Sequence, residues 1–479
     1  MVRSGVATEP MVCQEQVPIC RTNEEPETEL PSLRTEEASE LITQVGGRLA
    51  MFYEQWQKIT SDPFVLQSVQ GYKIPFTRTV TQISKPKVKF ASLKEQNDCE
   101  EAINQLLKKG AIEKCNPCSG QFISSYFLTP KSDGSKRFIL NLKKLNEFIK
   151  VEHFKMEDIR TASKLVSKNS YMIVFDLQDA YLTVPIYKKH RKYLRFEFKG
   201  NTYEFLVLPF GLCTAPYVYT KISKPVLRKL RKLGFLVVGY IDDFLLIAQS
   251  RAIYIEIFEI IRKIFCNLGF LINYKKSTLE PSKQVDFLGF TIDSESLVLK
   301  ITQKRQTQLS GLLKSFIEKK ECTIEQFASL IGSLVATCLA STYGWLYTKT
   351  MEREKILALQ SNSNNYNATM VLSDLSRSDL QWWQSNIHKN YKALHSTTTY
   401  QMTIFTDASR SGWGAFDGNK RAWGPWESSD NNNSINYLEL LAIKYALTSL
   451  SYNKININIL LRVDNTKAIA YFSKMDRIR

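Results

Sequence analysis

The chain has 479 residues, a length that predicts about three domains. Its hydrophobic fraction of 44% and charged fraction of 23% are those of a globular protein and exclude collagen-like and low-complexity classes. The net charge of +17 is uneven, because residues 1–50 hold nine Glu and four Arg and the rest therefore carries +22. This excess favours nucleic acid as a partner over a membrane, with charge for solubility alone as the alternative.

Several sequence features bear on the compartment. No apolar run reaches the length of a membrane span, and the N-terminus lacks the apolar region of a secretion signal. The nine cysteines are odd in number and irregularly spaced, so they form no disulfide framework. We therefore expect an intracellular protein of the cytoplasm or nucleus, neither secreted nor membrane-bound. Cys115 and Cys118 form a CxxC pair, but no second pair accompanies them, and no zinc site is predicted.

The predicted elements alternate between helices and strands. Residues 1–44 read as a disordered acidic leader, and aromatic residues at helical spacing follow from 45 onward. A helix is predicted over 92–113, and hairpins over 124–142, 193–208 and 235–248, the last with two aspartates at its turn. Residues 300–350 are helical and basic. The last 80 residues restart with a strand, a hairpin at Asp417-Gly418, a helix over 435–450 and a strand over 455–461. This order predicts an α+β multidomain protein.

Carboxylates at the ends of apolar strands are the first chemical signal. The buried-strand pattern YMIVF (171–175) runs into Asp176, and Asp242 and Asp243 interrupt the third hairpin. Such groups carry a desolvation penalty unless a cation or hydrogen bonds offset it. The structural alternatives are a helix N-cap for Asp176 and a turn for the aspartate pair. Together, carboxylates on neighbouring strands can hold two divalent ions about 4 Å apart for phosphoryl transfer, which points to a nucleotidyltransferase.

The motifs that contain these aspartates carry a family resemblance. FDLQDAY (175–181), LPFGLCTAP (208–216) and YIDDF (240–244) resemble the three palm motifs of retroelement reverse transcriptases, and KKSTLE (275–280) and FLGF (287–290) follow in order. PKSDGSKRFILNLKKLN (130–146) resembles the fingers motif that grips the nucleotide. The resemblance implies a right-hand polymerase with fingers, palm and helical thumb. It also implies two Mg²⁺ (or Mn²⁺) per site, and an RNA template, a DNA primer, RNA–DNA hybrid and dNTPs as partners.

The same resemblance assigns roles to individual residues. Asp176, Asp242 and Asp243 would be the metal-binding catalytic triad, with Asp243 contributing less because adjacent strand residues point to opposite sides. Tyr181 matches the aromatic gate that excludes a ribose 2′-OH, and its alternative is an ordinary core tyrosine.

The remaining matched residues concern the nucleotide. Phe210 and Gly211 would lie beneath it, Lys131 and Arg137 would hold its triphosphate, and Lys276 is the candidate general acid, although the adjacent Lys275 stays an alternative. Asn141 departs from the aspartate of many relatives, which puts one fingers contact in doubt.

A second carboxylate set occupies the C-terminal region. Asp407 in FTDAS, Glu439 in YLELLA and Asp464 in RVDN resemble the magnesium ligands of the ribonuclease H fold, with a solvated helix position as the alternative for Glu439. The family has a fourth carboxylate and a further helix downstream, whereas this chain stops at Arg479. We therefore expect an incomplete, truncated domain with weak or absent ribonuclease H activity.

The resemblance also divides the chain and suggests a branch. The predicted parts are a leader (1–44), an N-terminal extension packing on the fingers (45–90), fingers and palm (91–295), thumb (296–355), connection (356–399) and ribonuclease H-like domain (400–479). Residues 45–76, 327–350 and 379–384 resemble DIRS-like retrotransposons, whose separate recombinase and particle proteins would be further partners. The rival hypothesis is a non-catalytic relic that binds hybrid duplex without turnover.

Overall fold

The computed structural model describes residues 45–86, 92–130, 134–389, 391–394, 400–430, 432–455 and 457–473. The predicted leader and Lys131 lie outside the described residues. Within the described part, no helix combines the length and apolar character needed to cross a membrane.

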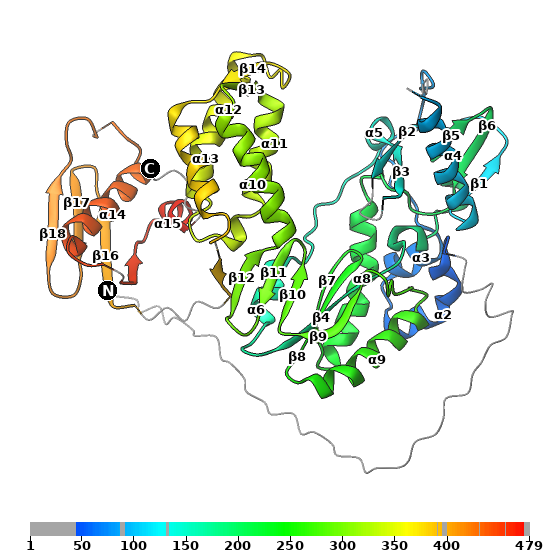
Figure 1. Ribbon diagram of the computed structural model, residues 1–479, viewed down its shortest axis with the longest axis horizontal. Coiled ribbons are helices and arrows are strands. Elements are labelled where there is room, and N and C mark those ends of the chain that lie inside the picture. The colour runs from blue at the N-terminus through cyan, green and yellow to red at the C-terminus, as the bar shows by residue number, and fades with distance from the viewer. Residues whose placement is uncertain are drawn as a thin grey trace, which may run out of the picture. The chain divides into compact units, whose positions relative to one another are not determined.

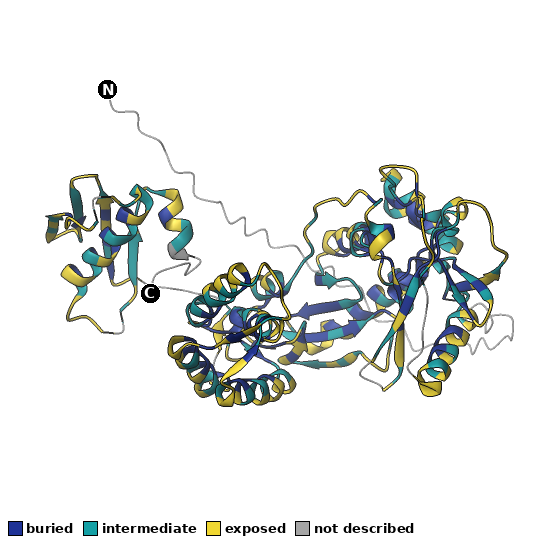
Figure 2. Cartoon of the chain, turned by 90° about the horizontal axis from the view of Figure 1, so that it is seen from above, coloured by how far each residue is buried: buried dark blue, intermediate teal, exposed yellow. Residues whose placement is uncertain are grey.

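A four-stranded antiparallel sheet, which we call the palm sheet after the predicted palm, lies within residues 171–282 (Figure 1). Its order is β7-β8-β4-β9, formed by Leu236–Tyr240, Asp243–Ala248, Tyr171–Asp176 and Thr278–Ser282. Helix α8 (Ala215–Lys232) packs on β7 and α9 (Arg251–Asn267) packs on β8. Side chains alternate between two cores, so Phe175 and Phe244 join the core on the side of α8 and α9, while Met172 and Leu245 join the core shared with the thumb. The inner strands β4 and β8 are largely buried (Figure 2), whereas the edge strand β9 has no buried residue.

The fingers consist of two small sheets and short helices. One sheet has the order β1-β6-β5 and the other pairs β2 with β3. The fingers elements are α4 (Leu93–Lys108), β1 (Ile112–Cys115), β2 (Ser125–Pro130), β3 (Lys136–Asn141), α5 (Lys143–Asn146), α6 (Ile159–Leu165, against β7), η2 (Ala180–Thr183), α7 (Lys188–Arg191), β5 (Arg195–Phe198) and β6 (Asn201–Phe205). The predicted helix and the three predicted hairpins are present. Helix α4 begins after Ser92, whose side chain accepts a hydrogen bond from the Glu95 backbone N–H.

The N-terminal extension contacts the palm as well as the fingers. It forms η1 (Arg48–Phe52), α2 (Tyr53–Ile59) and α3 (Pro63–Gly71), and both α2 and α3 contact α8. The buried Trp56 Nε1 donates to the Leu268 carbonyl at 3.1 Å. Farther along, Gln82 exchanges two hydrogen bonds with the Ile123 backbone in the fingers. The predicted packing on the fingers is therefore only part of the interface, since the palm contacts join residues distant in sequence and have no local signal.

The thumb contains a second four-stranded sheet and a helical layer. The sheet has the order β10-β11-β12-β15. The elements are β10 (Gln284–Phe287), β11 (Phe290–Asp293), β12 (Val298–Ile301), α10 (Gln303–Glu318), β13 (Glu321–Thr323), α11 (Ile324–Val335), η3 (Cys338–Ala340), η4 (Leu346–Thr348), α12 (Lys349–Ser361), β14 (Thr369–Val371), α13 (Asp374–Asn386) and β15 (Lys392–Ala393). The predicted thumb–connection boundary at 355 falls inside α12, and α13 of the predicted connection packs on α10 of the predicted thumb. Trp383 of α13 is buried in the same core as Leu313 of α10.

The C-terminal domain, taken by itself, has one sheet and two helices. The sheet order is β18-β17-β16-β19, with β16 and β19 parallel and the other pairs antiparallel. The elements are β16 (Met402–Ala408), β17 (Gly412–Phe416), β18 (Arg421–Pro425), α14 (Ile435–Ser451), β19 (Ile459–Arg462) and α15 (Thr466–Ser473). Helix α14 begins at the N-cap Ser434 and packs against β16 and β17 through Ile404, Ala415 and Ala446.

Candidate active sites of the palm and the C-terminal domain

The palm sheet brings Asp176, Asp242 and Asp243 together. Strands β4 and β8 pair so that Asp176 lies opposite Asp243, and Asp242 lies in the two-residue turn between β7 and β8. The Leu177 backbone N–H donates to the Asp242 carbonyl at 2.8 Å, which ties this turn to the end of β4. Ile241 has a φ of 54°, a left-handed conformation that β-branched residues rarely adopt. The surrounding pairing therefore holds a strained turn at the carboxylates, as is common at functional sites.

Burial raises the pKa of each of these carboxyl groups. For Asp243 the pKa rises to about 6, first because of desolvation and then because of the charges of Asp242 and Asp176. Desolvation is also the largest cause for Asp176 and for Asp242. Clustered carboxylates with raised pKa values are stabilised in their charged form by a bound cation, so the donor set fits a divalent metal ion.

Two cations lie within electrostatic range of the cluster. Lys276 lowers the pKa of Asp176, Asp242 and Asp243, and Arg137 lowers that of Asp242. Lys275 is not among these causes. This placement favours Lys276 over Lys275 as the lysine that acts at the site.

Asn273 is a site residue that the sequence did not predict. Its Nδ2 donates to Asp176 Oδ1 at 2.9 Å, and its backbone N–H donates to the Asp176 carbonyl at 2.8 Å. The Asp176 backbone N–H in turn donates to Ser277 Oγ at 3.1 Å. Asp176 is therefore oriented from both its side chain and its backbone. The one signal available was the position of Asn273 just before KKSTLE.

The candidate gate Tyr181 lies in η2 between two aromatic rings. Its ring centroid is 5.2 Å from that of Phe210 and 5.7 Å from that of Tyr219 of α8. The Arg137 guanidinium lies 4.8 Å from the Phe210 ring centroid, on the fingers side. Three predicted nucleotide residues, Arg137, Phe210 and Tyr181, are thus in one series of contacts. Tyr181 is 8% exposed, so burial alone is also compatible with a core role.

The fold places its own constraint on Gly211, beside the role predicted for it beneath the nucleotide. Its φ is 105°, and a Cβ there would lie 2.1 Å from the Leu140 carbonyl oxygen of β3. The absence of a side chain therefore permits close approach to the fingers backbone. Asn146 fixes the same loop, since its Nδ2 donates to the Gly211 carbonyl and its Oδ1 accepts from the Cys213 backbone N–H.

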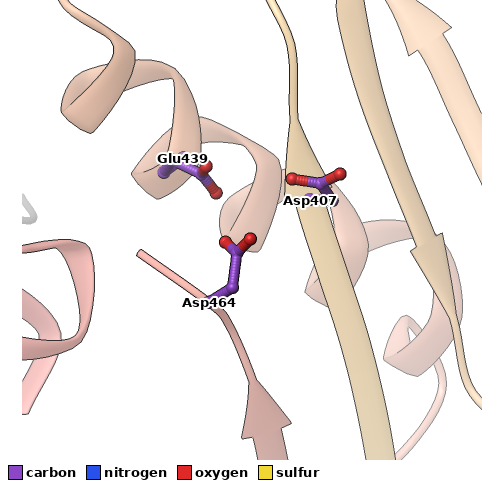
Figure 3. Close-up of side chains that lie close together, drawn as sticks. All are labelled: Asp407, Glu439 and Asp464. Carbon is purple, nitrogen blue, oxygen red and sulfur yellow. The ribbon is translucent and has the colours of Figure 1, made fainter. Parts of the chain in front are cut away.

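The C-terminal domain brings three carboxylates together (Figure 3). Asp407 lies on β16, Glu439 lies on α14, and Asp464 comes just after the end of β19. Each offers a carboxylate oxygen, and these atoms lie within 4.8 Å of one another. Glu439 is 4% exposed, and its Oε2 has no hydrogen-bond partner among the described residues. Burial first, and then the charges of Asp464 and Asp407, raise its pKa to about 7. A buried, unpartnered carboxylate of this kind fits a metal ion and excludes a solvated helix position for Glu439.

Comparison with known proteins identifies the central segment. Residues 129–292 match the family described as reverse transcriptase (RNA-dependent DNA polymerase). This segment is therefore similar to the reverse transcriptase family over about a third of the chain. It contains Asp176, Asp242 and Asp243, together with the gate and loop residues described above.

The curated relatives are distant and longer than this chain. The Transposon Tf2-3 polyprotein of Schizosaccharomyces pombe is 25% identical over 224 residues, which cover 45% of this chain and 16% of that protein. The enzymatic polyprotein of Figwort mosaic virus is 24% identical over 389 residues, covering 78% of this chain and 55% of that protein. The chain thus spans from about a sixth to just over half of the length of these polyproteins. Neither relative supports the DIRS-like branch, which stays a prediction.

Solved structures show the same fold over most of the chain. The foamy viral protease-reverse transcriptase in complex with dsDNA superposes with a TM-score of 0.57 at 16% identity, covering 92% of this chain and 99% of that one. The form of that protein in complex with RNA/DNA hybrid has a TM-score of 0.57 and covers 95% of this chain and 61% of that one. The mixed α+β fold is therefore shared with a foamy viral protein.

Proposed function

We propose that the chain is an RNA-directed DNA polymerase that extends a primer 3′-OH with dNTPs. The observation that carries the proposal is the clustering of Asp176, Asp242 and Asp243 on a reverse transcriptase-type palm sheet. Their burial and raised pKa values fit a pair of divalent ions better than a structural turn or a helix N-cap.

In this proposal Asp176 and Asp242 would hold two Mg²⁺ or Mn²⁺ ions, with Asp243 adding negative charge beside them. When bound, such ions activate the attacking hydroxyl and neutralise the leaving phosphate. Asn273 orients the Asp176 carboxylate through its side-chain amide. Lys276, whose charge acts on the Asp176 and Asp243 carboxylates, would be the general acid that gives a proton to departing pyrophosphate.

The nucleotide pocket is built from the fingers and the loop after β6. Arg137 would hold the triphosphate, supported by its contact with the Phe210 ring, and Lys131 would act beside it. Tyr181 would exclude a ribose 2′-OH by contact.

The proposed nucleic-acid partners follow from charge and from the relatives. The net charge of +17 provides the electrostatic attraction to phosphates, and foamy viral structures of this fold are bound to dsDNA or to RNA/DNA hybrid. We propose that this chain likewise holds an RNA template paired with a DNA primer. The DIRS-like origin is part of the proposal and rests on residues 45–76, 327–350 and 379–384 alone.

The C-terminal domain supports a second proposed site. In this proposal Asp407, Glu439 and Asp464 would bind Mg²⁺ in a ribonuclease H-type domain. The observation behind the proposal is the buried Glu439 Oε2, which has no hydrogen-bond partner among the described residues. Cleavage of the RNA strand of a labelled hybrid by the parent chain and by Glu439→Gln tests it. Weak cleavage that the variant abolishes is expected, and equal cleavage by both would contradict the assignment.

The polymerase is tested by primer extension on an RNA template with Mg²⁺ or Mn²⁺. The parent is expected to extend and Asp242→Asn to be inactive. Asp286→Asn is the matched control, because Asp286 is exposed on β10 and its amide replacement still accepts from Thr291 Oγ1. If the parent is silent yet binds hybrid tightly and in a salt-dependent manner, the non-catalytic relic replaces the polymerase.

A further inference from the structure

Tyr181 stands at the end of a series of aromatic rings that begins in the N-terminal extension. We call this series the aromatic column: Trp56, Phe270, Tyr219 and Tyr181. The ring centroids are 5.8 Å apart for Trp56–Phe270, 6.3 Å for Phe270–Tyr219 and 5.7 Å for Tyr219–Tyr181. All three contacts are edge-to-face, the arrangement that aromatic pairs prefer. The column therefore links α2 to the gate through specific contacts.

The aromatic column is buried and fixed at its far end. Trp56 and Tyr219 are 0% exposed, Phe270 is 1% exposed, and the Trp56 indole donates to the Leu268 carbonyl. Phe270 also contacts Phe265 of α9, with ring centroids 5.5 Å apart. Because protein interiors are close-packed, a change in one of these rings is transmitted to its neighbours rather than absorbed by empty space.

The gate is thus held from two sides that belong to different parts of the molecule. One contact of Tyr181 is with the Phe210 ring, over which the Arg137 guanidinium lies, so this contact belongs to the proposed nucleotide pocket. On the other side, Tyr219 is the aromatic contact of Tyr181, and Tyr219 is located by Phe270 and Trp56. The position of the Tyr181 ring depends on the column as much as on the pocket.

We propose that Tyr219, Phe270 and Trp56 are positioning residues of the sugar gate, so that the N-terminal extension contributes to the choice of dNTP over rNTP. This inference rests on the proposed polymerase function and on the gate role of Tyr181. A gate that works by steric exclusion relaxes when its ring can retreat into space behind it. Tyr219 is fully buried, with its ring centroid 5.7 Å from that of Tyr181, so removing the Tyr219 ring would open such a space.

The test compares the kcat/KM ratio for a dNTP and the matching rNTP. Tyr219→Leu removes the ring behind the gate and is expected to lower this discrimination about tenfold. Tyr219→Phe keeps the ring and is expected to retain it. Trp56→Leu, two contacts away, is expected to lower it about threefold. Tyr126→Leu is the control, since Tyr126 is also buried, at 8% exposed, but packs on Phe138 and Phe196 in the fingers. With this variant the ratio is expected to stay at the parent value.

A crystal structure of Tyr219→Leu gives a readout that needs no activity. The Tyr181 ring is expected to shift toward the vacated position, and an unmoved ring would overturn the inference. So would a Tyr219→Leu enzyme that is less stable but discriminates as the parent does, or a Tyr126→Leu enzyme that discriminates equally poorly. Failure of the proposed polymerase function has a different signature, because the parent would then extend no primer. The position of the Tyr181 ring in the Tyr219→Leu structure would still show whether the aromatic column positions that ring.

Discussion

The two carboxylate clusters of this chain are built in different ways. The palm cluster comes from paired neighbouring strands and has protein groups beside it: Asn273 donates to Asp176, and the charge of Lys276 offsets part of the rise in all three pKa values. The C-terminal cluster comes from two parallel strands and a helix, and its central Glu439 oxygen has no partner among the described residues. The palm therefore compensates part of its own charge, whereas the C-terminal site depends more on a cation.

The largest expected effect separates the palm aspartates from one another. Asp176→Asn is expected to reduce kcat for primer extension by about 10³-fold or more, because it removes a ligand that Asn273 holds in place. Asp243→Asn is expected to reduce kcat by only about 10- to 100-fold, because in the proposal Asp176 and Asp242 are the main metal ligands and Asp243 only adds negative charge beside them. Single-turnover extension measures both. Equal losses would show that the adjacent carboxylates share the metals equally.

The C-terminal cluster should respond more strongly to pH than the palm. The pKa of Glu439 is raised to about 7 in the folded protein, above the usual 4.5. Its contribution to the free energy of unfolding is therefore fully present below about pH 4.5 and lost as the pH rises through about 7. Glu439→Gln is expected to stabilise the metal-free domain by about 1–3 kcal/mol at pH 8 and by little at pH 4.

Thermal unfolding in EDTA measures this effect, and addition of Mg²⁺ supplies the control. Mg²⁺ should raise the Tm of the parent domain more than that of Glu439→Gln, because the ion compensates the buried charge. A variant that gains the same Tm at pH 4 and pH 8 would show that packing, not charge, is responsible.

The palm cluster gives a smaller effect of the same sign. The pKa of Asp243 is raised from 3.8 to about 6, so its stabilising contribution is present below about pH 4 and lost as the pH rises through about 6. Asp243→Asn is expected to raise the unfolding free energy of the metal-free protein by about 1 kcal/mol at pH 8, after allowance for solvent screening. A larger gain than that of Glu439→Gln would reverse the proposed difference between the clusters.

The sequence predicted features that depend on neighbouring residues and missed those that depend on contacts between residues far apart in the chain. The hairpin 235–248 and its aspartates have local signals, namely apolar strands around a turn, and they were predicted. Asn273 was missed because its contact with Asp176 spans 97 residues and has no periodic pattern. The structural requirement for Gly211 was not predicted, because the Leu140 carbonyl that a Cβ would meet belongs to a strand far away in sequence. For Glu439 the helix was predictable, but its burial, which decides between ligand and solvated residue, depended on the packed domain.

The last prediction concerns Asn273, the residue that distinguishes the palm from the C-terminal site. Asn273→Ala removes the hydrogen bond to Asp176 Oδ1 and is expected to lower kcat about tenfold, with little change in KM for dNTP, because it orients a ligand and touches no substrate. Asn267→Ala is the control, since Asn267 is the exposed last residue of α9 and lies outside the cluster. Asn273→Asp is the sharper variant: it keeps the shape but places another carboxylate against Asp176, so its loss of activity should exceed that of the alanine and should diminish as Mg²⁺ is raised. If the aspartate variant matched the parent at low Mg²⁺, the palm would carry no more internal compensation than the C-terminal cluster does.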